Sequence, residues 1–73
     1  MKKKEKLALV DALMASVIPF TDGIGRYKKE TPSEYEKSVI SAFLKLCKET
    51  NYTPDDVWEH NIIADCYAAL RNN

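Results

Sequence analysis

The segment TPSEYEKSVISAFLKLCKETNYTPDD, residues 31–56, contains two helix starts with one complete amphipathic helix between them. Residues 31–34 (TPSE) and residues 53–56 (TPDD) each place a threonine before a proline and an acid. A hydroxyl accepts a bond from a free N–H of the first helical turn, and proline presets φ there. Acids interact favourably with the positive end of the helix dipole. The segment therefore predicts one helix over about residues 33–50 and a second that begins at about residue 54.

The first of these helices has one apolar face. At about 100° per residue, that face collects Tyr35, Val39, Ile40, Ala42, Phe43, Leu44, Leu46 and Cys47. The opposite face carries Lys37, Ser38, Ser41, Lys45, Lys48 and Glu49. This pattern is typical of a surface helix that buries one side.

Residues 54–71 repeat the pattern less cleanly. The predicted core stripe is Ile62, Ile63, Cys66, Tyr67, Ala69 and Leu70. The predicted solvent side is His60, Asn61, Ala64, Asp65, Ala68 and Arg71. Trp58 lies at the edge of the stripe, where it either closes one end of the core or stands partly exposed as a binding residue.

A third helix is predicted over about residues 3–18, ended by Pro19. Large apolar residues cover about half of its circumference: Leu7, Leu9, Val10, Leu13, Met14, Val17 and Ile18. Alanines fill most of the remainder. A surface helix usually has a narrower apolar stripe, so we expect this one to lie between the other two or in a dimer interface.

The predicted fold is all-α: one domain, residues 1–73, with helices over about 3–18, 33–50 and 54–71. The connection between the first two contains both glycines, Gly23 and Gly25. It exceeds the usual 2–8 residues of helix–helix connections. A phosphate-binding loop is disfavoured, because neither phosphate-loop glycine motif is present and no strand precedes the glycines.

The chain is short enough that its core is small. At 73 residues a domain buries roughly 60% of its unfolded surface, and such a core rarely supplies more than about 3–5 kcal/mol. Cys47 and Cys66 lie within helical patterns, so we interpret both as buried small apolar residues rather than as a disulfide pair.

No chemical motif stands out. For His60, the adjacent Glu59 points elsewhere and the residue one turn further on is Ala64. The serines lack a nucleophile-elbow context, and the acids lack calcium-loop spacing. We expect no enzyme activity, no cofactor and no metal. The apolar run after the first lysines contains Asp11 and is too short to span a membrane, so a cytoplasmic protein is expected.

Charge is balanced overall but unevenly distributed. The formal net charge is zero, which disfavours a dedicated nucleic-acid binder. Residues 1–29 nevertheless carry seven basic residues against three acids, and residues 30–73 carry four against eight. The candidate basic patch consists of Lys2, Lys3, Lys4, Arg26, Tyr27, Lys28 and Lys29. Nucleic-acid regulation through this patch is the alternative function.

The favoured function is a non-enzymatic protein–protein interaction module that also self-associates, with no membrane contact. Small bacterial or phage proteins of this style often act as inhibitors or adaptors, and a host or regulatory protein is the expected partner. The candidate binding residues, called the acidic corner from here on, are Tyr52, Asp55, Asp56, Trp58 and Glu59. They combine aromatic anchors with an acidic rim.

Overall fold

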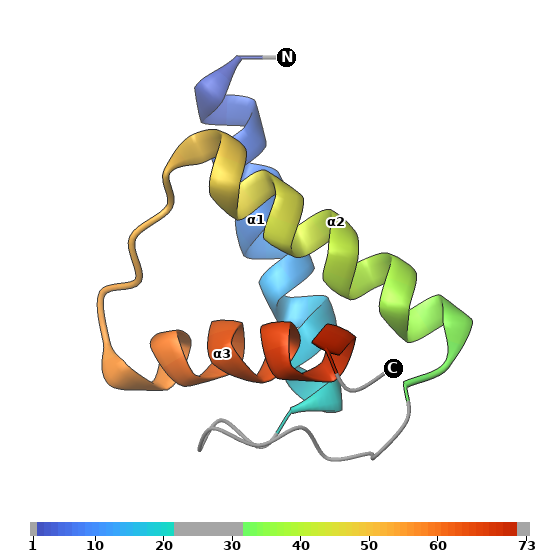
Figure 1. Ribbon diagram of the computed structural model, residues 1–73. Helices are drawn as coiled ribbons and strands as arrows, with labels where there is room; N and C mark the ends of the chain where they lie inside the picture. Colours follow the sequence, from blue (N-terminus) through green and yellow to red (C-terminus); the bar gives the residue numbers. More distant parts are fainter. Residues whose placement is uncertain (1, 22–31, 72–73) are drawn as a thin grey trace.

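The computed structural model describes residues 2–21 and 32–71 and consists there of three α-helices and one short 3-10 helix (Figure 1). Helix α1 spans Lys3–Val17, the 3-10 helix η1 spans Ile18–Phe20, α2 spans Glu34–Thr50 and α3 spans Val57–Arg71. The all-α prediction is confirmed, and the three helices fall where they were predicted, except that α3 begins about one turn late. The predicted glycines lie outside the described residues.

Helix α1 ends where proline requires it to end. Pro19 has no N–H to donate and its ring disfavours a continuing α-helix. The chain tightens at this point into the single turn of η1, with the Ile18 N–H still bonded to the Met14 carbonyl. This agrees with the predicted end.

Helix α2 begins with a capping box. The Glu36 N–H donates to Ser33 Oγ at 3.1 Å, and the Ser33 N–H donates to Glu36 Oε1 at 2.9 Å. Two free N–H groups of the first turn are thereby satisfied reciprocally. Ser33 is therefore the cap, and Pro32 lies just before the helix instead of in its first turn.

The end of α2 is set by one residue in the left-handed region. Asn51 has φ 53° and ψ 40°, which reverses the chain direction. The Tyr52 N–H then bonds to the Cys47 carbonyl at 3.0 Å and the Asn51 N–H to the Lys48 carbonyl at 3.3 Å. This is the Schellman arrangement, with asparagine in place of the usual glycine.

Helix α3 begins later than predicted because Asp56, not Thr53, is its cap. Asp56 Oδ1 accepts from the Glu59 N–H at 2.8 Å, and the Thr53 hydroxyl instead donates to the Asn51 carbonyl at 3.4 Å. Both helix starts therefore share a cap three residues before a glutamate, Ser33 with Glu36 and Asp56 with Glu59.

One contiguous core joins the three helices. It consists of Val10, Met14, Val17, Ile40, Phe43, Leu44, Cys47, Ile62, Cys66 and Ala69. Four side-chain predictions are wrong. Tyr35 and Ala42, placed on the apolar face of α2, are exposed, Tyr35 to 71%. Tyr67 is also exposed, and Asp65, placed on the solvent side of α3, is fully buried.

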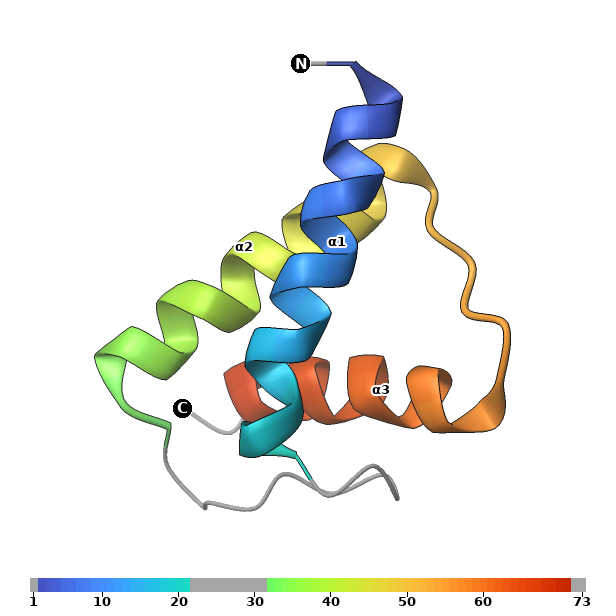
Figure 2. The same cartoon turned by 180° about the vertical axis from the view of Figure 1, so that it is seen from behind.

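The helices form an open arrangement in which α1 lies behind the other two (Figures 1 and 2). The start of α1 lies beside the end of α2, where Lys6 Nζ is 3.3 Å from Glu49 Oε2. Helices α2 and α3 approach near the start of α2 and the end of α3. They diverge towards the connection formed by residues 51–56 (Figure 1). In the described residues, no helix has the length and apolarity to cross a bilayer.

Candidate protein-binding surface

The acidic corner lies where residues 51–56 enter α3, and the structure brings its polar members together. Glu59 is at the centre: its Oε2 accepts from the Tyr52 hydroxyl at 3.0 Å and from the Asp55 N–H at 3.2 Å. Its own N–H is held by Asp56. Four of the five predicted residues therefore form one hydrogen-bonded network, which holds the connection in place and fixes the position of the acids.

Negative charge at the corner is reinforced by α1. Burial raises the pKa of Tyr52 to about 12, with the hydrogen bond to Glu59 and the charges of Glu59, Asp11 and Asp55 acting in the same direction. The influence of Asp11 places an acid of α1 within electrostatic range of the corner. The sequence analysis missed this contribution because it depends on how α1 packs, which no local pattern reveals.

Apolar side chains stand exposed beside these acids. Trp58 is 47% exposed and Val57 is 73% exposed, although both belong to the first turn of α3. Neither is among the buried residues of the core cluster. Trp58 is therefore half exposed and not a buried core residue. An exposed tryptophan next to acids has the composition of a binding anchor with a polar rim.

The candidate basic patch is described only in part. Lys2, Lys3 and Lys4 are exposed at the start of α1. Arg26, Tyr27, Lys28 and Lys29 lie outside the described residues, so the structure does not test whether the two groups meet.

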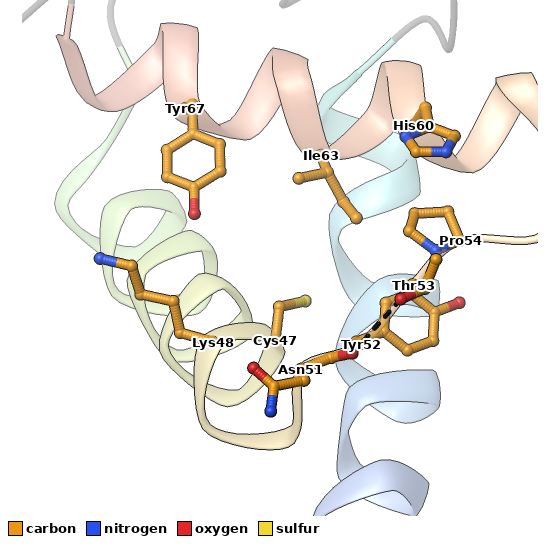
Figure 3. A pocket seen from close by; sticks show the side chains of 9 residues that line it. All are labelled: Cys47, Lys48, Asn51, Tyr52, Thr53, Pro54, His60, Ile63 and Tyr67. Atoms are coloured by element: carbon orange, nitrogen blue, oxygen red, sulfur yellow. Dashed lines mark hydrogen bonds between the residues drawn. The ribbon is translucent and has the colours of Figure 1, made fainter.

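His60 lines a hollow, which the sequence did not predict. The hollow has a volume of about 480 Å³ and opens between α2 and α3 beside residues 51–54 (Figure 3). Tyr67 and Ile63 reach into it from α3, and Lys48 and Cys47 border it from α2 (Figure 3). Within the described part of the chain, the His60 imidazole has no hydrogen bond to a carboxylate that would orient it as a general base.

The two cysteines are buried free thiols, as predicted. Burial raises the pKa of Cys47, and burial together with the charge of Asp65 raises the pKa of Cys66 to about 12. Because the thiolate is the nucleophile and the metal ligand, neither cysteine is prepared for such chemistry near neutral pH. Among the described residues, no three His, Cys, Asp or Glu side chains gather as metal ligands would.

No known protein family matches this chain, and neither a curated protein nor a solved structure is significantly similar to it.

Proposed function

We propose that this protein is a non-enzymatic interaction module that binds another protein through the acidic corner. The single observation that carries the proposal is the 47% exposure of Trp58 in the first turn of α3, next to Asp55 and Asp56. Tryptophan is among the commonest residues of binding hot spots. In the monomer, the apolar surface of the indole ring is in contact with water, which is unfavourable. A partner that covered the ring would remove this contact.

The charge of the corner indicates what kind of partner fits. Asp11, Asp55, Asp56 and Glu59 are all acids, and opposite charge across an interface favours correct encounter and excludes wrong partners. The partner surface is therefore basic, with an apolar recess for the indole ring. Inhibition or adaptation of a host or regulatory protein is the proposed role.

Self-association is a second part of the proposal and is confined to one side of α1. Of the large apolar residues of this helix, only Leu9 is exposed, at 39%, beside the exposed Ala8 and Ala12. The monomer itself covers the others fully or partly. A contact through so small an apolar surface is weak and depends on concentration.

Nucleic-acid binding is the alternative, supported by the exposure of Lys2, Lys3 and Lys4. These lysines lie at the positive end of the α1 dipole, where they do not favour the helix, so an anionic partner would explain their position. Phosphate contacts would make the affinity fall steeply with salt. Binding of duplex or single-stranded DNA or RNA at low salt that disappears with salt would favour this function over the first.

The test is quantitative affinity capture from the native host, using the full chain, a Trp58→Ala variant and a Tyr35→Ala variant as baits. Tyr35 is a more exposed aromatic residue outside the corner. We expect a protein that is enriched on the wild type and on Tyr35→Ala but depleted on Trp58→Ala. Capture of the same proteins by all three baits would refute the assignment of the corner.

A further inference from the structure

The side of the molecule between α2 and α3 carries a second surface, of opposite charge to the acidic corner. Two hollows, of about 480 Å³ and about 320 Å³, lie between these helices and share Lys48 and Tyr67 in their walls. The two hollows adjoin at these residues and are together called the α2–α3 groove here. Residues 51–54 line the larger hollow, and Leu70, near the end of α3, lines the smaller one.

The floor of the groove is apolar. Leu44 and Cys47 contribute from α2, and Ile63 and Leu70 contribute from α3. Leu44 and Cys47 are buried members of the core, and Ile63 and Leu70 are partly buried and pack against it. The exposed ring of Tyr67 divides the depression into its two halves. Such a floor offers places for a few apolar side chains of an occupant and no deep cavity for a compact ligand.

Two lysines and one histidine are the basic residues that line the groove. They are Lys45 and Lys48 on α2 and His60 on α3. Among the described residues that line it, none is Asp or Glu. Glu49, the nearest acid on α2, is engaged by Lys6 on the side of α1. The acidic corner adjoins the wide end of the groove, where Tyr52, which lines it, donates to Glu59 Oε2 at 3.0 Å.

We infer that the α2–α3 groove binds an acidic amphipathic helix of a partner protein. The choice of occupant rests on charge complementarity: a basic rim over an apolar floor matches a helix whose apolar stripe is flanked by Asp or Glu. His60 and Leu70, at the two ends of the α3 wall, are ten residues apart, or about 15 Å along the helix. Apolar side chains at positions i, i+3 or i+4, and i+7 of a bound helix span about 10 Å, which fits this length.

The acidic corner determines which side and which end of the bound helix carry acidic residues. Negative side chains are attracted to Lys45 and Lys48 and repelled by Asp55 and Asp56 at the wide end. The acids of the occupant therefore face the α2 side and avoid the end near residues 51–56. The groove and the acidic corner adjoin, because Tyr52 belongs to the corner and also lines the groove, whereas Trp58 does not line it.

The test begins with selection of a phage-displayed library of helical peptides on the full chain. The enriched peptide is then synthesised and its affinity measured by fluorescence anisotropy. We expect enriched sequences with apolar residues at i, i+3 or i+4, and i+7 and with Asp or Glu beside them. Affinity should fall about tenfold or more with Lys48→Glu and with Tyr67→Ser, and it should fall with rising salt.

Matched controls separate the groove from general effects. Lys4→Glu reverses an exposed lysine on α1, and Tyr35→Ser removes an exposed tyrosine of α2 that does not line the groove. Both should leave the affinity within about twofold, as should Trp58→Ala, which disables only the acidic corner. Because Lys48 and Tyr67 are exposed, their variants should retain the helical circular dichroism spectrum.

Three results would overturn the inference. The first is a selection that enriches no acidic helices. The second is an enriched peptide that binds the Lys48→Glu and Tyr67→Ser variants as tightly as the wild type. The third is a dimer of the chain that the Lys48→Glu substitution converts to a monomer. The last result would mean that a second copy, and not a partner helix, fills the groove.

Discussion

Asn51 controls where α2 stops and where the connection to the acidic corner starts. Its φ of 53° is the only positive φ of a non-glycine residue in the described chain. Asparagine tolerates this region better than most residues, and glycine better still.

We therefore expect Asn51→Ala to lower the free energy of unfolding by about 1 kcal/mol, because a Cβ without a compensating local hydrogen bond is disfavoured there. Asn51→Gly should leave it unchanged or raise it. Urea unfolding of both variants measures the difference. Equal stabilities for alanine and glycine at this position would contradict the left-handed conformation.

Tyr52 makes the free energy of unfolding depend on pH in the alkaline range. Its pKa is raised from 10.0 to about 12, so between these values the unfolded chain loses the phenolic proton while the native chain keeps it. The contribution of this residue is fully present below pH 10 and is lost as the pH rises through about 12.

An absorbance titration of tyrosinate should show one of the four tyrosines ionising near pH 12, with that step absent in Tyr52→Phe and present in Tyr35→Phe. A titration in which Tyr52→Phe removes an ordinary step near pH 10 would show that the bond to Glu59 does not form.

At the scale of elements, the sequence predicted where the second and third helices begin, but it did not fully predict which residues cap them. The acids and prolines of residues 31–34 and 53–56 correctly marked two starts. The residues that form the caps, Ser33 and Asp56, are identified by the glutamate three positions later, a signal that the threonine–proline pattern obscured. The displaced start of α3 follows from this, since Thr53 bonds backwards to Asn51.

For helix α1, the sequence likewise did not predict which face is buried. Its apolar residues exceed one stripe, and sequence alone could not say which of them the other helices cover. The structure places Met14 in the core and leaves Leu9 exposed.

We expect Met14→Ala to cost about 2–5 kcal/mol, enough to unfold much of a domain of this size, and Leu9→Ala to cost less than about 1 kcal/mol. Thermal unfolding followed by circular dichroism compares the two. A larger loss for Leu9→Ala would mean that another side of α1 is buried in solution.

At the scale of the whole molecule, sequence reasoning gave the fold class but not the surface. Asp65 lies about 40° outside the predicted core stripe, beside Ala69, at 100° per residue, and the packing of the helices buries it nonetheless. The prediction for Tyr35 was wrong in the opposite direction. This residue lies on the apolar side of α2, yet it is exposed because no other described element covers it. The groove between α2 and α3 depends on the divergence of two helices, which periodicity within each helix cannot reveal.

Self-association through the Leu9 side of α1 predicts a mass that rises with concentration. Light scattering should detect the rise in the wild type and its loss in Leu9→Asp, whereas Tyr35→Asp should behave as the wild type. A mass of one chain at all concentrations would remove self-association from the proposal and leave partner binding intact.

The central claim is that Trp58 and the acids beside it bind a basic protein partner. The most direct measurement is the dissociation constant of the captured partner for the wild type, Trp58→Ala and Tyr35→Ala. A hot-spot tryptophan contributes about 2 kcal/mol or more, so Trp58→Ala should weaken binding about 30-fold or more, while Tyr35→Ala stays within about twofold. Equal dissociation constants for the wild type and Trp58→Ala would contradict the account.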